Sequence, residues 1–415
     1  MTIDSWREVK LQEVVRELVD RGRDQGLPVL SITKNHGIML ASERFGKEIH
    51  GRKLDKYRVA PRNSIALDPM LLWSGTIGRQ KIVAEGLVSP DYRVYEVLDG
   101  ALPEFLEYAF KGHQMASQFR AGARGTNVRR NRISRSDFMS RKLSLPPLSE
   151  QRKITEILRS VDEAIARTEA VIGEVLVVKK GLMQELLTRG LPDRHTRFKQ
   201  TEIGEVPEEW DVVPVISVLK GPPKNGISPR AREIPPGRPT FSIAAVRAGR
   251  VSIDDNLKYI DLEDAKAEKY LLRRGDILVV RGNGNLDLMG RCGQVDVSPE
   301  GCVYPDILMR MSPAVGIVSK FLVYTWNSEI VHDQLAAKAK TTNGTHKINQ
   351  KDVSSTFIPL PSIDEQKRIA EALDALSGYR ETCKHKLEGL SVAKQALMSV
   401  LLTGEVRVQV EEEAA

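Results

Sequence analysis

Basic residues gather without acidic neighbours at matching places in the two halves of the chain. The stretch from Arg120 to Arg135 holds six arginines, and the stretch from Ala337 to Lys351 holds four lysines and His346. Each stretch contains a Gly-Thr pair, which is typical of a flexible loop. Guanidinium and ammonium groups on such loops contact the phosphates of nucleic acids. The pattern predicts two equivalent phosphate-contacting loops, with two solvated surface loops as the alternative.

A glycine-rich stretch follows an expected strand in each half. It runs from Trp73 to Arg79 in the first half and from Arg281 to Asn285 in the second. Arginine and asparagine are side chains that make paired hydrogen bonds with the edges of guanine and adenine. Neither stretch fits the pattern G-x-x-x-x-G-K-[ST] of a nucleotide-binding loop. The stretches predict contacts with bases, with plain surface turns as the alternative.

The predicted DNA-contacting residues come mainly from these loops. They are Lys34, Asn35, Arg79, Arg124, Arg129, Arg130, Arg132, Arg281, Asn283, Asn285, Arg291, Lys340, Thr345, His346 and Lys347. We expect Lys340 and Lys347 to contact phosphates whatever the sequence of the DNA. We expect Arg281 and Asn283 to recognise bases.

The sequence lacks the residue patterns of enzymes that act on DNA. Pro90-Asp91 and Pro305-Asp306 resemble the start of a nuclease motif, but the next Glu-x-Lys begins at Glu365, about 60 residues on and in an expected helix. Neither a glycine-rich cofactor loop nor the Asn/Asp-Pro-Pro-aromatic motif of a methyltransferase is present. The three cysteines form no CxxC pair. We predict a non-catalytic protein without catalytic residues, cofactor or bound metal.

The elements that position these loops are repeated. Ile133 to Thr188 aligns without a gap on Ile348 to Thr403, and the pair Glu150-Gln151 falls on Glu365-Gln366. The regions upstream match more loosely, as in PEFLEYAF and SKFLVYTW, which both predict short helices. Such a pattern indicates two divergent domains, each followed by a well-matched segment.

Each matched segment carries a seam of residues at steps of four and three, from Ile154 to Leu186 and from Ile369 to Leu401. No proline interrupts either seam, so each predicts a long coiled-coil helix. A single helix does not bury so narrow an apolar stripe alone, so we expect the two copies to pack together, antiparallel. Expected N-caps are Ser149 and Asp364, and expected stops are Gly190 and Gly404.

One lysine interrupts each seam at the same position, Lys179 in the first copy and Lys394 in the second. Two interpretations stay open. The lysine extends along the helix to reach solvent near a fraying end, or it fixes the register of the helix pair.

Length and composition set the broad class. A chain of 415 residues is too long for a single hydrophobic core, so two or more domains are expected. Its 41% of hydrophobic residues favours a globular fold. The net charge of +7 fits a nucleic-acid partner without requiring one. The polar N-terminus and the lack of a long apolar run predict a cytoplasmic protein with no membrane contact.

The motifs resemble a known family. The run from Arg197 to Trp210, RFKQTEIGEVPEEW, is similar to the central linker of type I restriction-modification specificity subunits. The repeated Leu-Pro-x-x-x-Glu-Gln-[Arg/Lys]-[Lys/Arg]-Ile and Leu-Met-x-x-Leu-Leu-Thr resemble the two conserved helical regions of that family. The resemblance covers essentially the whole chain. The loop around His346 is closer to the usual pattern than the loop around Arg129 and Arg130.

The resemblance implies a protein that recognises double-stranded DNA through two domains, each reading one half of a split site. It implies two methyltransferase subunits docked on the helices, with restriction subunits joining that complex, and it places S-adenosylmethionine on the methyltransferase. The alternative is a protein-interaction scaffold with a coiled-coil spacer and no sequence-specific DNA binding.

The expected fold class is α+β, with two mixed α/β target-recognition domains joined by an antiparallel pair of long helices in a pseudo-two-fold arrangement. Expected boundaries are 1–148 for the first recognition domain, 149–190 for the first helix, 191–360 for the linker and second domain, 361–404 for the second helix, and 405–415 for a disordered acidic tail.

Overall fold

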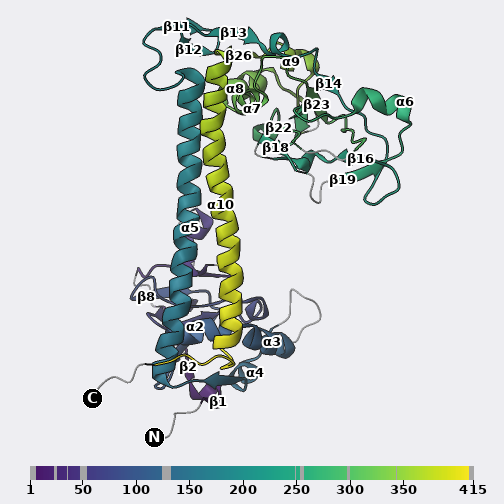
Figure 1. Ribbon diagram of the computed structural model, residues 1–415. Helices are drawn as coiled ribbons and strands as arrows, with labels where there is room; N and C mark the ends of the chain where they lie inside the picture. The colour runs from purple at the N-terminus through teal and green to yellow at the C-terminus, as the bar shows by residue number, and fades with distance from the viewer. Residues whose placement is uncertain are drawn as a thin grey trace. The chain divides into compact units, whose positions relative to one another are not determined.

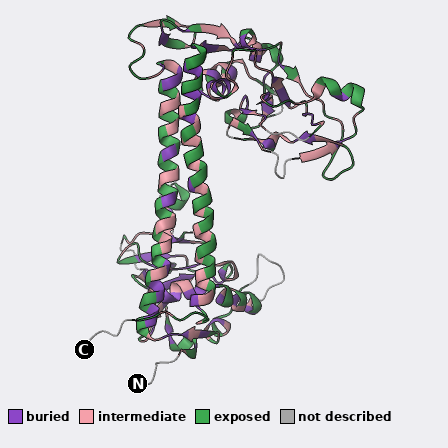
Figure 2. Cartoon of the chain, viewed as in Figure 1, coloured by how far each residue is buried: buried purple, intermediate pink, exposed green. Residues whose placement is uncertain are grey.

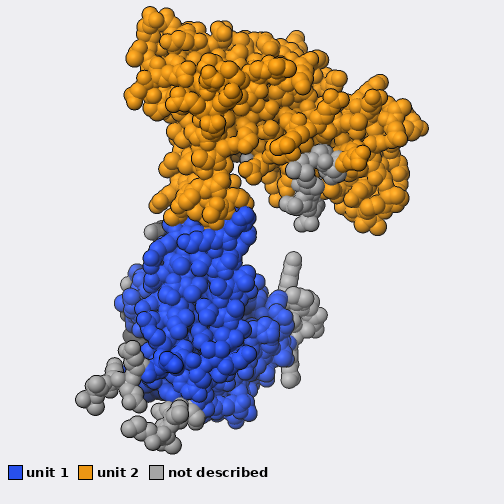
Figure 3. Space-filling view, in the orientation of Figure 1, with its two compact units in different colours: residues 1–170, 384–415 blue, residues 171–383 orange. Residues whose placement is uncertain are grey.

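Two long helices run through the computed structural model, α5 (Leu148–Thr188) and α10 (Ile363–Leu401), as Figure 1 shows. The structure describes residues 6–22, 26–34, 36–46, 54–123, 132–247, 249–252, 257–296, 300–342 and 344–410. The chain divides into unit 1 (residues 1–170 and 384–415) and unit 2 (residues 171–383), coloured separately in Figure 3. Each unit contains part of both helices.

The helices are antiparallel within each unit, as the sequence predicts. In unit 1, Lys394 Nζ lies 2.5 Å from Asp162 Oδ1, so the last part of α10 packs beside the first part of α5. In unit 2, Lys179 Nζ donates to Ser377 Oγ at 2.7 Å, so the end of α5 packs beside the first part of α10. The predicted pair of long helices is confirmed.

The helix starts differ slightly from the prediction. Ser149 and Asp364 lie inside the first turn, so their assignment as N-caps is wrong. In α10 the residue before the helix, Ser362, accepts the Glu365 N–H at its hydroxyl. Gly190 and Gly404 follow the helix ends with φ of +79° and +76°, a conformation that glycine adopts without steric cost.

Burial along the helices is strongest where a domain packs on them. Ile154 and Leu158 are fully buried in the unit 1 core, and Ile369 and Leu373 are fully buried in unit 2. Elsewhere both helices carry mostly exposed and half-buried residues, with single buried ones such as Val175 and Cys383 (Figure 2). The outward face includes Val177, which is 73% exposed.

The domain of unit 1 is a mixed α/β fold. Its four-stranded sheet has the order β2-β9-β6-β7, and two-stranded sheets pair β1 with β10, β3 with β4 and β5 with β8. The strands are β1 (Arg7–Lys10), β2 (Val15–Leu18), β3 (Leu30–Thr33), β4 (Gly37–Leu40), β5 (Arg58–Pro61), β6 (Ile65–Leu67), β7 (Ile77–Arg79), β8 (Glu85–Val88), β9 (Arg93–Val97) and β10 (Lys142–Leu145). The α-helices are α1 (Ala41–Phe45), α2 (Pro103–Lys111), α3 (His113–Gly122) and α4 (Arg135–Met139).

The domain of unit 2 has a six-stranded sheet of order β14-β23-β20-β22-β18-β17, with smaller sheets β15-β19-β16, β21-β25-β24, β13-β26 and β11-β12. The strands are β11 (Phe198–Thr201), β12 (Gly204–Pro207), β13 (Asp211–Pro214), β14 (Lys224–Asn225), β15 (Ala231–Arg232), β16 (Arg238–Phe241), β17 (Val246–Arg247), β18 (Gly249–Val251), β19 (Leu257–Ile260), β20 (Ile277–Val280), β21 (Gly282–Asn283), β22 (Cys292–Gln294), β23 (Leu308–Met311), β24 (Lys340–Thr342), β25 (Thr345–Lys347) and β26 (Phe357–Leu360). The α-helices are α6 (Asp264–Ala267), α7 (Ser319–Trp326), α8 (Glu329–Lys338) and α9 (Gln350–Ser354).

The two domains begin and end in the same way. Each opens and closes on an antiparallel pair: Arg7 is opposite Leu145 in unit 1, and Asp211 is opposite Leu360 in unit 2. The predicted short helices at PEFLEYAF and SKFLVYTW are α2 and α7, and the strand expected before the glycine-rich stretch of the second half is the buried β20. Among the described residues, no helix is both long and apolar enough to span a membrane.

Candidate nucleic-acid interface

In unit 2 the structure brings the predicted basic loop and the predicted glycine-rich loop into one small sheet. Strand β25 pairs on one side with β24 and on the other with β21. Asn283 of the glycine-rich loop lies opposite His346, and Gly282 lies opposite Lys347. A Cβ at Gly282 would lie 3.2 Å from the Lys347 side chain, so the two strands approach closely there.

Two lysines face each other across this sheet. Lys340 on β24 is the direct partner of Lys347 on β25, and both are exposed. Like charges directly opposite each other in a strand pair are destabilising. The neighbouring Thr341 and His346 are joined by a contact of 3.1 Å between Oγ1 and Nδ1, and Thr345 is half-buried. Among the described residues no acidic side chain pairs with either lysine, so the hairpin presents a positive surface that suits an anionic ligand.

The glycine-rich loop of unit 2 is ordered by its own asparagines. The Asn283 side chain accepts the Asn285 N–H at 2.9 Å, and the Asn285 side chain accepts the Asp287 N–H at 2.9 Å. Within the described part of the chain neither NH2 group has a hydrogen-bond partner, so both can donate to a ligand. Arg281 is half-buried and reaches the Asp306 carbonyl at 3.4 Å.

Arg291 is hydrogen-bonded within its own domain. Its Nε donates to the Asp287 carbonyl at 2.8 Å and its Nη1 donates to the Asn327 carbonyl at 3.0 Å. Those bonds hold the end of the loop against the helical side of unit 2. Contact of Arg291 with DNA stays a prediction, and one that this geometry does not favour.

Arg79 in unit 1 is likewise paired within the domain. Its guanidinium lies 2.9 Å from Glu104 and 3.6 Å from Glu107, both on α2, and donates to Asn63 Oδ1 at 2.8 Å. These carboxylates neutralise its charge, so its contact with DNA also stays a prediction that the geometry disfavours.

The other predicted residues of unit 1 are placed only in part. Lys34 is exposed in the turn between β3 and β4, and Arg132 is exposed directly before Ile133. Asn35, Arg124, Arg129 and Arg130 lie outside the described residues.

Strand pairing shows which loops of the two units correspond. In unit 1, β6 leads through a 3-10 turn at Leu72–Ser74 into β7, and Ile65 pairs with Arg79. In unit 2, β20 leads through a 3-10 turn at Leu286–Leu288 into β22, and Ile277 pairs with Gln294. Arg79 therefore corresponds to Gln294 on a strand, and the counterpart of the loop after β20 is the loop after β6.

A backbone hydrogen bond supports this correspondence. The Ile133 N–H donates to the Pro69 carbonyl at 3.1 Å, and the Ile348 N–H donates to the Arg281 carbonyl at 3.0 Å. Ile133 and Ile348 are aligned in the sequence repeat, which puts Arg132 in the place of Lys347. Sequence reasoning found only the end of this loop, Trp73 and Ser74, and missed residues 68–72, although the aligned isoleucines together with this bond identify them.

Asp68 anchors that missed loop. Burial raises the pKa of its carboxyl above the ordinary value, against the lowering effect of hydrogen bonds from the backbone of Met70 and Leu71. Asp91 raises the same pKa further, and Arg132 lowers it. The carboxyl is thus a local structural group beneath an exposed loop.

The repeated Glu-Gln pair attaches each domain to its helix. The Gln151 carboxamide accepts the Leu102 N–H at 2.8 Å, at the start of α2, and donates to the Pro146 carbonyl at 2.8 Å. The Gln366 carboxamide accepts the Val318 N–H at 3.1 Å, at the start of α7, and donates to the Pro361 carbonyl at 2.9 Å. The same side chain thus caps the equivalent helix in both units.

The glutamate of each pair binds a tryptophan from the start of its domain. Trp6 donates to Glu150 at 3.0 Å, and Trp210 donates to Glu365 at 3.1 Å. Arg407, which follows α10, also pairs with Glu150. His195, which follows α5, lies 2.8 Å from Glu365. The segment after each long helix therefore contacts the glutamate at the start of the other long helix.

The two seam lysines meet tyrosines of the recognition domains. Lys179 lies 5.0 Å from the centre of the Tyr324 ring, and Lys394 lies 5.7 Å from the centre of the Tyr108 ring. Tyr108 donates to Asp162 at 2.7 Å, and burial and this bond raise the pKa of its hydroxyl. The lysines therefore join helix to domain, beyond the two roles open from the sequence.

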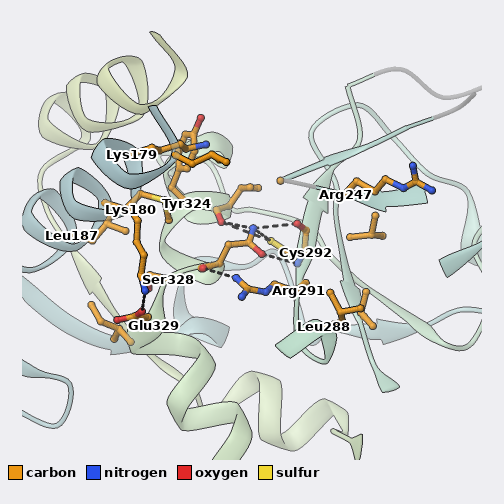
Figure 4. Close-up of a pocket in the computed structure, with 18 of the residues that line it drawn as sticks. Lys179, Lys180, Leu187, Arg247, Leu288, Arg291, Cys292, Tyr324, Ser328 and Glu329 are labelled. Carbon is orange, nitrogen blue, oxygen red and sulfur yellow. Dashed lines mark hydrogen bonds and ion pairs between the residues drawn. The ribbon is translucent and has the colours of Figure 1, made fainter. Parts of the chain in front are cut away.

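Unit 2 contains a cavity of about 930 Å³ between the end of α5 and the domain (Figure 4). Lys180 pairs with Glu329 at 2.8 Å at one side, and Asn327 holds Cys292 through hydrogen bonds at the other. Burial, followed by the charge of Arg380, lowers the pKa of Lys179, which also lines the cavity. In the part of the chain that the structure describes, no group of His, Cys, Asp and Glu side chains is placed to hold a metal.

Comparison with known proteins points to one family. Residues 27–176 and 207–390 match the family described as type I restriction modification DNA specificity domain. The specificity subunit of the type I restriction enzyme MjaVIII of Methanocaldococcus jannaschii is 27% identical over 352 residues, covering 82% of this chain and 80% of that subunit. The EcoKI specificity subunit of Escherichia coli K12 is 25% identical over 322 residues, covering 74% and 66%.

A solved structure shares the fold. A chain from the work described as "Structural basis underlying complex assembly and conformational transition of the type I R-M system" superposes with a TM-score of 0.60 at 18% identity. The match covers 97% of this chain and 98% of that chain. Two mixed domains on a pair of long helices are therefore common to both.

Proposed function

Because the chain belongs to the family of type I restriction modification DNA specificity domains, we propose that it is the non-catalytic specificity subunit of a type I restriction-modification complex. Each domain binds one half of a bipartite site in double-stranded DNA. The observation that supports the proposal is the β21-β25-β24 sheet, which puts Asn283, a side-chain type that pairs with adenine edges, beside the opposed cations Lys340 and Lys347.

We further propose the partners and the division of the chain. The long helices dock two methyltransferase subunits, which hold the S-adenosylmethionine, and restriction subunits join that complex in the cytoplasm. The recognition domains are residues 1–148 and 191–360, the latter with its linker. The helical segments are 149–190 and 361–404, followed by the tail 405–415.

The hairpin lysines provide the first test. Replacing Lys340 and Lys347 by alanine is expected to weaken binding to all duplexes alike and to reduce the slope of log affinity against log salt by about 1 for each phosphate that is no longer neutralised. Lys266→Ala is the control, because Lys266 is exposed on α6 and pairs with Glu263. Fluorescence anisotropy between about 50 and 200 mM salt measures both slopes.

The outcomes separate DNA recognition from a protein scaffold. A steep salt response in the unmodified protein, reduced only by the hairpin changes, supports the proposal. A flat response, or no preference for any DNA sequence over random duplex, favours the scaffold.

A further inference from the structure

The loop after β6 offers different chemistry from its counterpart after β20. We call residues 68–74 the apolar loop and residues 281–288 the amide loop. The apolar loop carries Met70 and Leu71, 39% and 43% exposed, with the half-buried Trp73 beside them. The amide loop carries Asn283 and Asn285, and its exposed Leu288 lines the cavity of Figure 4.

The polar groups of the apolar loop bond to one another. Asp68 accepts the Met70 N–H at 2.9 Å, and the Trp73 indole N–H donates to the Met70 carbonyl at 2.9 Å. The Ser74 hydroxyl donates to the Leu71 carbonyl at 2.7 Å. These bonds hold the loop in shape. They leave the hydrocarbon of Met70 and Leu71 as the surface that meets a ligand.

The apolar loop adjoins a cation, Arg132, at the place where unit 2 has Lys347. Pro69 is bonded to the backbone of Ile133, and the exposed Arg132 directly precedes that residue. A ligand for this surface combines an anionic backbone with an apolar group. In the major groove of DNA, the C5-methyl of thymine is the apolar group that a base edge presents.

We propose that the apolar loop of unit 1 reads thymine methyl groups through Met70 and Leu71, whereas the amide loop of unit 2 reads its half-site by hydrogen bonds. This inference rests on the proposed function and names the base chemistry that one of the two domains recognises. It predicts that the two half-sites differ, because the loops occupy equivalent places and present hydrocarbon in one domain and carboxamides in the other.

Replacing thymine by uracil tests the proposal, because uracil lacks the methyl group and keeps the hydrogen-bonding groups. The full chain, assembled with its methyltransferase subunits, is titrated with duplexes carrying uracil in one half-site at a time. Removing each methyl that the loop touches is expected to weaken binding about fourfold, from the transfer free energy of one buried carbon. The effect is confined to the half-site read by unit 1.

The double change Met70→Ala with Leu71→Ala is expected to abolish the difference between thymine and uracil. Val19→Ala is the matched control, since Val19 is an apolar residue of unit 1, 70% exposed and outside the loop. Equal binding of both DNAs in either half-site, with sequence preference intact, overturns the proposal. So does a double variant that keeps the full difference, or one that instead releases the methyltransferase subunits. Loss of all sequence preference in the unmodified protein contradicts the proposed function itself.

Discussion

Gln151 and Gln366 are the side chains on which each domain is held to its helix. Both are buried, with exposed fractions of 0% and 2%, and both use the carboxamide oxygen to cap a domain helix. Their NH2 groups bond to proline carbonyls just before α5 and α10. One side chain thus satisfies backbone groups of two elements, which explains how an uncharged polar residue is accommodated in this packed position.

Gln366→Leu is expected to destabilise the protein by about 2–4 kcal/mol, because the Val318 N–H and the Pro361 carbonyl lose their buried partner. The urea midpoint, followed by Trp fluorescence, measures the loss. Gln200→Leu is the control, because Gln200 is exposed on β11. An unchanged midpoint in Gln366→Leu would show that the Gln366 carboxamide does not stabilise the contact between helix α10 and its domain.

At the scale of elements, the segment after α10 is a structural part of unit 1 up to residue 410. Val408 packs on the unit 1 core, and a Cβ at Gly404 would lie 3.1 Å from the Trp6 ring. Burial raises the pKa of Glu150, but hydrogen bonds from Arg407 and Trp6 outweigh it and hold the pKa below the ordinary value. Within the predicted disordered tail, Arg407 and Val408 therefore contact unit 1.

Arg407→Gln is expected to lower the urea midpoint at pH 7, and the difference from the unmodified protein is expected to vanish in acid. A carboxyl with a lowered folded pKa stabilises the fold above its unfolded pKa of about 4.3 and loses this contribution as pH falls through the folded pKa. Urea titrations at a series of pH values measure this. Arg167→Gln, in the exposed pair with Glu163, is the control. A difference that persists unchanged below about pH 3 would assign the effect to packing.

The long helices were predictable because a seam of apolar steps and the absence of proline are local features. The residues at which the helices begin were not predictable. The Pro147 carbonyl and the Ser362 hydroxyl accept N–H groups of the first turns, and the sequence pattern does not distinguish them from the neighbouring cap candidates. Lys179 and Lys394 were recognised as unusual seam residues. Their tyrosine partners come from helices far away in the sequence.

The candidate site was predictable in unit 2 and only partly in unit 1. The basic and glycine-rich stretches of unit 2 stand out by composition, and β21 pairs them. For Arg79, DNA contact stays a prediction that the geometry disfavours, and its partners Glu104 and Glu107 could not be foreseen because they lie on a helix more than twenty residues on. The apolar loop contains no basic residue and no Asn or Gln. Its correspondence to the amide loop is seen only from the pairing of the strands.

At the scale of the whole molecule, each recognition domain is an insertion between neighbouring strands. Asp211 to Pro214 pairs with Phe357 to Leu360, and Arg7 to Lys10 pairs with Lys142 to Leu145. The entry and exit of each domain are therefore side by side. A domain with this property is exchangeable without altering the helices that follow it.

Exchanging residues 211–360 for the equivalent segment of a relative is expected to change the half-site read by the second domain and to leave the other half-site intact. The reason is that β13 and β26 close the segment on itself, while the apolar loop and Arg132 belong to unit 1. Base-resolution mapping of adenine methylation in cells carrying the complete system measures both half-sites at once. The reciprocal exchange of residues 7–145 is the control and is expected to change only the first half-site. Two altered half-sites after either exchange, or two unaltered ones, would contradict the assignment of one reader to each domain.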